Sequence, residues 1–184
     1  MPDTYIVEHC SPTLAGLKTG SLFSVKNREL NDPTGELRDL NRLLTPKGLR
    51  AVPVRKTESH TLIYVYRPDR LDKDLNCPLA RNILKKKGYI CGNADRCVVQ
   101  LIRRLTDDKD FPHEIGLFLG YPPSDVEGFM KDPDNGVKCI GFWKVYTNRE
   151  KAEKTFAKFR KCTEVYCKEL AGGRPLAQLI VSTC

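Results

Sequence analysis

The stretch LRAVPVRKTESHTLIYVYR, from Leu49 to Arg67, predicts the sheet against which the rest of the chain packs. Two runs rich in β-branched and aromatic residues, 49–55 and 60–67, flank the polar segment KTES. This pattern is typical of a β-hairpin. Because Pro53 has no N–H to donate to a neighbouring strand, its strand is expected at an edge or at a bulge.

Two helices and a strand are predicted before this hairpin. In SPTLAGLKTG, Ser11 has the side chain of an N-cap, Pro12 suits the first helical position and Gly20 follows the end. A short helix is therefore expected there. Residues 21–25, SLFSV, are a candidate strand. The segment 32–44 repeats the proline start signal and has leucines at helical spacing, which predicts a second helix.

The chain after the hairpin is predicted to be mostly helical. Start signals and apolar spacing indicate helices at 77–88, about 93–105, 110–120, from 124, 148–170 and from about 174. One strand is expected in this half, at 139–147. We therefore expect an α+β fold in which several helices surround a small mixed sheet with a hairpin. The length of 184 residues suits one domain, 1–184.

Composition favours a folded protein outside the membrane. Apolar residues make up 40% and charged residues 29% of the chain, a balance typical of folded domains. No apolar run approaches the roughly 20 residues that span a bilayer. The N-terminal segment MPDTYIVEHC has no basic region followed by an apolar one, so no signal peptide is indicated. A cytoplasmic location without a membrane partner is expected.

The eight cysteines are expected to be free thiols, because the cytoplasm keeps thiols reduced. No Cys-x-x-Cys pair occurs, so neither a zinc ribbon nor a thioredoxin-type centre is indicated. Cys77-Pro78 has the form of a haem thiolate contact, although proline is also a good first helical residue. A metal site would need residues from distant segments, and the sequence names no cofactor.

A net charge of +8 draws phosphates or acidic partners by long-range attraction. Lysines recur at spacings of three and four in the predicted long helix, at Lys151, Lys154, Lys158 and Lys161. These four are candidates for binding nucleic acid or another anion. The alternative is a solvated helix face, because Glu150 and Glu153 can pair with the lysines at helical spacing.

Cys10 is the residue of the N-terminal segment with the clearest potential for chemical reactivity. It follows His9 and directly precedes the predicted helix start at Ser11. A thiol at the positive end of a helix dipole, beside a protonated histidine, ionises more readily than an ordinary cysteine. The alternative is a cysteine that packs in the core as a small apolar residue.

The segment HEIG, beginning at His113, invites a comparison with zinc metalloproteases. That motif needs a second histidine four residues after the first, and Leu117 occupies the position here. What remains is His113 as an acid or base beside Glu114 in the first turn of a helix. The alternative is a solvated helix start beside a buried apolar face.

Four segments carry a resemblance to a known family: HCSPTLAGLK at 9–18, HEIGLFLGYP at 113–122, GFWKVY at 141–146 and FAKFRKC at 156–162. The chain resembles an uncharacterised family of anaerobic Gram-positive bacteria, known as a domain of unknown function. The resemblance spans nearly the whole chain. It implies a bacterial, cytoplasmic, single-domain protein, and it implies no reaction, cofactor or catalytic residue.

Two classes of function stay open from the sequence. The first is a thiol-dependent or metal-assisted activity centred on Cys10, with His9 or His113 as the proton partner and Glu114 as the orienting carboxylate. The second is a non-enzymatic basic module that binds nucleic acid or an acidic protein. The first is slightly favoured, because unusual residues are concentrated near Cys10 whereas net charge is a diffuse signal.

Overall fold

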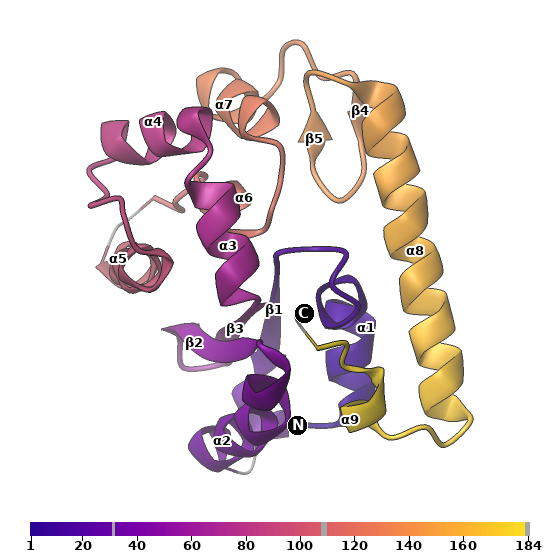
Figure 1. The fold of residues 1–184 in the computed structure, drawn as a ribbon. Coiled ribbons are helices and arrows are strands. Elements are labelled where there is room, and N and C mark those ends of the chain that lie inside the picture. The colour runs from indigo at the N-terminus through magenta and orange to yellow at the C-terminus, as the bar shows by residue number, and fades with distance from the viewer. Residues whose placement is uncertain (31, 108–109, 183–184) are drawn as a thin grey trace.

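In the computed structural model, which describes residues 1–30, 32–107 and 110–182, the centre is a three-stranded sheet (Figure 1). Its strands are β1 (Gly20–Lys26), β3 (His60–Tyr66) and β2 (Arg50–Lys56), in the order β1-β3-β2. The predicted hairpin is confirmed as the β2–β3 pair. Pro53 lies on the edge strand β2, beside a register shift, so both predictions for it are confirmed.

The sheet is antiparallel rather than mixed. Strand β3 pairs antiparallel with both β1 and β2. The two outer strands therefore run parallel to each other, but β3 separates them. The chain returns from β1 to β2 through α2 (Pro33–Leu44), as the sequence predicted, without forming a parallel pair. The α+β class is confirmed.

Helices bury both faces of the sheet, because alternate side chains of a strand point to opposite faces. Ile63 and Val65 join a core formed with α1 (Asp3–Leu14), α2 and α9 (Leu176–Leu179). Tyr64 and Tyr66 join a second core on the other face. Its helices are α3 (Pro68–Leu75), α4 (Pro78–Lys86), α5 (Ala94–Asp107), α6 (Ile115–Phe118) and α7 (Pro123–Lys131).

The first helix begins earlier than the sequence predicted. It runs over Asp3–Leu14, so Cys10 and Ser11 lie toward its C-terminal end. Ser11 is not an N-cap, because its hydroxyl donates to the carbonyl of Val7 one turn back. The buried face of Ile6, Val7, Cys10 and Leu14 holds the helix in place, although Pro12 lies inside it and cannot donate a hydrogen bond to the carbonyl one turn back.

The long helix α8 (Arg149–Ala171) packs along α1, and Asn148 caps it as a side-chain acceptor. Before it, the expected strand 139–147 is wrong. The chain forms a tight hairpin of β4 (Cys139–Ile140) and β5 (Lys144–Val145). Gly141 permits this turn, because a Cβ at that position would lie 2.3 Å from the ring of Phe156.

Three smaller differences concern the helices after the sheet. The sequence missed α3, which begins with Pro68 at its first position. It placed the start of α6 at residue 110, whereas the helix begins at Ile115. The helix expected from 124 is α7, which begins at Pro123 after the N-cap residue Pro122, and no side chain caps this end. The predicted helices α4, α5, α8 and α9 are confirmed.

The remaining short elements are two 3-10 turns, η1 (Asn27–Glu29) and η2 (Thr45–Lys47). None of the helices within the described residues combines the length and apolar character that crossing a membrane requires.

Candidate functional site

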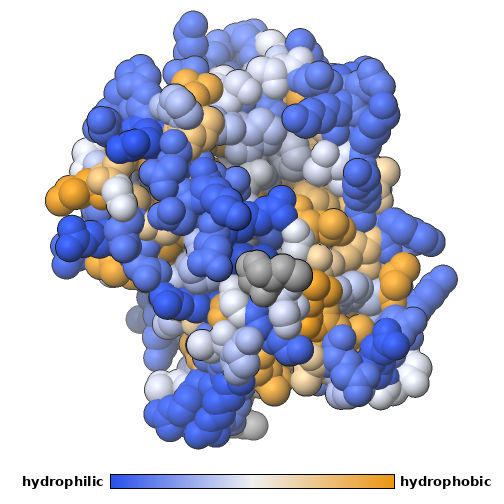
Figure 2. Space-filling view, in the orientation of Figure 1, coloured by the Kyte–Doolittle hydropathy of each residue, from blue (hydrophilic) through white to orange (hydrophobic). Residues whose placement is uncertain are grey.

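A cleft of about 620 Å³ opens between the turn after α1, helix α3, the α6–α7 corner and α8. In Figure 1 the indigo segment after α1 lies below the β4–β5 hairpin, with α3 on one side and α8 on the other. Hydrophilic residues gather in the middle of the same face in Figure 2. The residues that give the cleft its chemistry are Lys18, Thr19, Arg70, Lys73, Asp74, Tyr121, Asp125, Trp143 and Lys151.

Lys18 is the unusual residue of this cleft. Gly16 adopts a φ of +73° after α1, and the N–H groups of Leu17 and Lys18 both donate to the carbonyl of Pro12. This tight turn carries the lysine side chain into the wall of the cleft, where only 8% of the residue is exposed. Its Nζ lies 5.4 Å from the centroid of the Tyr121 ring.

The ammonium of Lys18 has no hydrogen-bond acceptor and no ion-pair partner among the described residues. Every fully buried side-chain nitrogen or oxygen in that part of the chain does have a hydrogen-bond partner, so the unpartnered Nζ must reach the solvent in the cleft. Burial lowers the pKa of Lys18 to about 8, because removal from water disfavours the charged form.

Three other cations line the cleft nearer the surface. Arg70 is half-buried, and one of its nitrogens donates to the carbonyl of Gly16. Lys73 and Lys151 are exposed and form no ion pair with any described residue. Of the two acids, Asp74 accepts a hydrogen bond from the hydroxyl of Thr19. The cleft thus holds more positive than negative charge.

Asp125, the second acid, is buried and fully occupied with structural bonds. Its carboxylate accepts hydrogen bonds from Trp143 Nε1 at 2.9 Å, from the N–H groups of Tyr146 and Thr147 at 2.9 Å, and from the Thr147 hydroxyl at 2.8 Å. These bonds fix Trp143, whose ring stacks on Tyr121 with 4.9 Å between centroids. Asp125 therefore holds the aromatic wall that faces Lys18.

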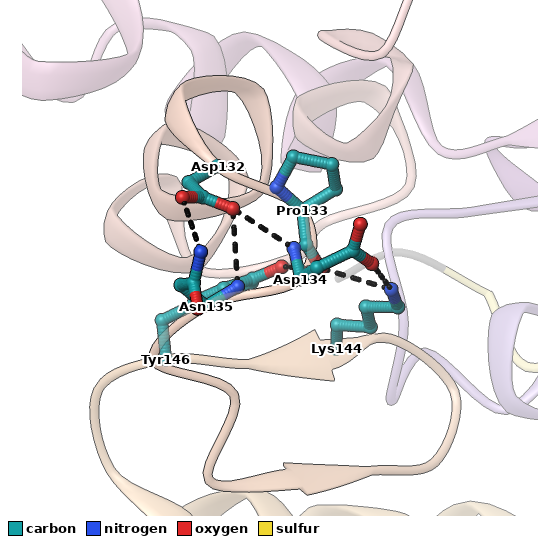
Figure 3. Close-up of polar contacts among 6 residues, drawn as sticks. All are labelled: Asp132, Pro133, Asp134, Asn135, Lys144 and Tyr146. Carbon is teal, nitrogen blue, oxygen red and sulfur yellow. Dashed lines mark hydrogen bonds and ion pairs between the residues drawn. The ribbon is translucent and has the colours of Figure 1, made fainter.

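The loop 132–135 supports the same hairpin through contacts with Lys144 and Tyr146 (Figure 3). Asp132 accepts two backbone N–H bonds within the loop. The carbonyl of Pro133 accepts hydrogen bonds from Lys144 Nζ and from the hydroxyl of Tyr146, both at 2.9 Å. Because Lys144 is the first residue of β5 and Tyr146 directly follows the strand, these bonds fix the strand that comes after Trp143.

Comparison with known proteins places the chain in a family. A family model described as a protein of unknown function (DUF3793) matches residues 6–180. The chain belongs to the DUF3793 family. Neither the curated proteins nor the solved structures contain a match to it.

Cys10 of this DUF3793 chain is completely buried. Burial raises the pKa of its thiol to about 12, although the nearby charge of Lys18 acts in the opposite direction. The helix start that was expected to activate the thiol lies elsewhere, since Cys10 is near the C-terminal end of α1. His9 is exposed and stacks on Phe23 with 5.4 Å between ring centroids.

His113 and Glu114 lie apart from Cys10. Glu114 is buried, accepts a hydrogen bond from the Tyr89 hydroxyl at 3.0 Å and lies 3.7 Å from Arg104. His113 is exposed and meets the ring of Phe129 edge-on. Tyr89 belongs to the core on one face of the sheet, whereas Cys10 belongs to the core on the other. The structure therefore does not bring the four predicted site residues together.

The four candidate lysines of α8 lie in three different settings. Lys151 lines the cleft. Lys154 pairs with Glu150 at 2.6 Å and Lys161 with Glu164 at 3.4 Å, while Lys158 is exposed. Glutamates of the same helix thus neutralise Lys154 and Lys161, and nucleic-acid binding stays a prediction.

The cysteines and a possible metal site were also considered in the sequence. The seven cysteines within the described ranges are free thiols, and Cys184 lies outside those ranges. Cys77 is the N-cap residue of α4 and lies at the cleft wall, half-buried. Across residues 1–30, 32–107 and 110–182, no three His, Cys, Asp or Glu side chains gather as a metal site.

The sequence reasoning missed Lys18 and Tyr121 as site residues. Lys18 is the last residue of HCSPTLAGLK, and Tyr121 lies near the end of HEIGLFLGYP. Trp143, in the third quoted segment of this DUF3793 chain, completes the aromatic wall. The signal that could have found the site is the lysine that ends the otherwise uncharged run CSPTLAGL.

Proposed function

We propose that this protein binds a small anion in the cleft lined by Lys18, with Lys18 as its innermost contact. The observation that carries the proposal is the ammonium of Lys18, which is buried, reaches the cleft and has no anionic partner among the described residues. Charged groups this deeply buried are normally paired. A bound anion would supply the missing partner.

The surroundings of Lys18 support the same proposal. A volume of about 620 Å³ is within the range of small-molecule sites. Arg70, Lys73 and Lys151 add positive charge at the mouth, and the stacked rings of Tyr121 and Trp143 give one wall a fixed shape. Within HCSPTLAGLK, the candidate functional residue is therefore Lys18 rather than Cys10, because Lys18 reaches the cleft and Cys10 is buried in the core.

Titration calorimetry at low ionic strength tests the proposal, with citrate and pyrophosphate as probes of carboxylate and phosphate chemistry. The wild type should bind at least one of them. The variant Lys18→Met, which keeps the length of the side chain and removes its charge, should bind at least about tenfold more weakly, a difference of about 1.4 kcal/mol. Lys154→Met, which makes the same charge change on an exposed residue of α8, is the matched control and should bind like the wild type.

Two results would overturn the proposal. One is the absence of binding by either anion to the wild type. The other is equal binding by Lys18→Met and the wild type. A single-stranded oligonucleotide is the third probe: if it binds more tightly than both small anions and its affinity is unchanged in Lys18→Met, the basic-module alternative is favoured instead.

A further inference from the structure

We propose that the amine of Lys18 forms an imine with a ligand that carries both a carbonyl and an anionic group, such as a 2-oxo acid. This inference rests on the proposed anion site and names its substrate class. The geometry behind it is an amine that ends at the cleft, beside the Tyr121 ring, with no acceptor among the described residues to hold it as an ammonium.

The positions of the cations indicate two separate roles. Arg70 is half-buried, and Lys73 and Lys151 are exposed at the mouth of the cleft. Any of these can hold an anionic group while remaining charged. Lys18 lies deeper than all three. A ligand anchored at the mouth by its anionic end would present its other end to Lys18, and a carbonyl is the group with which a buried amine reacts.

The reaction balances without a further reagent. The neutral amine attacks the carbonyl carbon and a C–N bond forms. The C–O bond then breaks, both amine hydrogens end on the departing oxygen as water, and a C=N bond remains. The step needs an unprotonated amine, and the lowered pKa of Lys18, about 8, provides a neutral fraction near neutral pH. Exposed lysines have a far smaller one.

Charged and titratable groups from several elements face Lys18 or line its cleft. They are Cys10 from α1, Arg70, Lys73 and Asp74 from α3, Cys77 at the N-cap of α4, Tyr121 from the α6–α7 corner, Asp125 from α7 and Lys151 from α8. Burial raises the pKa of Tyr121 to about 12 and that of Cys10 also to about 12. Both therefore stay neutral across the range in which Lys18 titrates, so the pH response of the amine belongs to Lys18.

Reductive trapping on the wild-type protein tests the inference. The protein is incubated with pyruvate, sodium borohydride reduces any imine to a stable secondary amine, and peptide mass spectrometry locates the adduct. We expect Lys18 to be labelled at least about tenfold more than Lys154 or Lys158. The rate at Lys18 should level off above about pH 8, whereas labelling of exposed lysines should keep rising toward their usual pKa.

The controls separate this inference from the proposed function. Acetone, a carbonyl compound without an anionic group, should label Lys18 at least about tenfold less than pyruvate, and citrate should compete with pyruvate. Equal labelling of Lys18 and exposed lysines by pyruvate would overturn the inference. If that result accompanies intact citrate binding by calorimetry, the anion site stands and only the imine fails; loss of both removes the site. The mapping uses only the wild type, so the stability of a variant does not enter.

Discussion

The ammonium of Lys18 lies over the ring of Tyr121, with 5.4 Å between Nζ and the ring centroid. A cation above an aromatic face gains about 2 kcal/mol when it is shielded from water. The hydration that an ammonium loses when it is largely buried is larger than this. The contact with Tyr121 therefore offsets only part of the cost, and the remainder explains why the pKa of Lys18 is lowered rather than raised.

Removing this charge should stabilise the fold. The pKa of Lys18 falls from 10.5 to about 8 on folding, so between these pH values the unfolded chain holds a proton that the folded chain has released. Wild-type stability therefore gains from Lys18 as pH rises through this window, and the full cost is present below it. Near pH 7, Lys18→Met should raise the free energy of unfolding by up to about 3 kcal/mol.

Urea denaturation of both proteins near pH 7 and near pH 10 measures this effect. The advantage of Lys18→Met should shrink at the higher pH. Cys10 acts in the opposite direction, because its raised pKa costs stability above its ordinary value, but it is present in both proteins and largely cancels in their difference. A stability difference that does not change with pH would be inconsistent with a buried, titrating Lys18.

Cys10 should behave as a core residue rather than as a nucleophile. Because its thiol is sealed from solvent and its pKa is raised, limiting iodoacetamide should label Cys139, which is half-buried, before Cys10. Cys10→Ser should lower the free energy of unfolding by about 1–3 kcal/mol through a poorly satisfied hydroxyl, and Cys139→Ser should have less effect. First labelling at Cys10, found by mass spectrometry, would restore the reactive-thiol hypothesis.

Asp125→Ala should loosen the aromatic wall of the cleft. The substitution removes the acceptor for Trp143, Tyr146 and Thr147, so we expect a loss of about 3 kcal/mol in unfolding free energy. Trp143 is the single tryptophan of the chain, and its fluorescence should shift to the red. Asp134→Ala, at an exposed position of the neighbouring loop, is the control. Unchanged emission in Asp125→Ala would refute the positioning role.

Arg67 ties the end of α1 to the C-terminal segment. Its Nε donates to the carbonyl of Thr13 at 2.8 Å, and its Nη2 donates to the carbonyls of Leu14 at 2.8 Å and Val181 at 2.7 Å. A lysine cannot reproduce this fork. Arg67→Lys should therefore cost about 2–4 kcal/mol in thermal or chemical unfolding, whereas Arg55→Lys, on an exposed edge-strand residue, should cost less than about 0.5 kcal/mol.

Local sequence patterns correctly predicted the elements in which the apolar spacing and the capping residues match the burial seen in the fold. The hairpin of 49–67 alternates between two cores, and α8 has a side-chain cap at Asn148. The start of α1 could not be predicted from the local sequence pattern. Ser11-Pro12 imitates a helix start, but burial of Ile6, Val7 and Cys10 against the sheet extends the helix back to Asp3. Tertiary packing outweighs the local signal there.

The candidate site was only partly predicted from the sequence. The segment 9–18 was singled out, but for Cys10 rather than for Lys18. The difference between the two depends on residues far along the chain: Tyr121 lies against Lys18, and Cys10 is buried in a core cluster that also draws residues from β1, β3 and α9. Burial of one side chain by distant segments is a tertiary property, and no spacing of residues around position 10 reports it.

The central claim is that an anion binds beside Lys18, and the protons exchanged on binding test it most directly. Citrate stays ionised near pH 8, so an anion next to Lys18 should raise the pKa of its amine and draw a fraction of a proton from the buffer. Calorimetric titration with citrate in two buffers of different ionisation enthalpy measures this uptake. We predict buffer-dependent heats for the wild type and Lys154→Met, and no such uptake with at least about tenfold weaker binding for Lys18→Met. Equal heats in both buffers for the wild type, or equal affinity in Lys18→Met, would contradict the account.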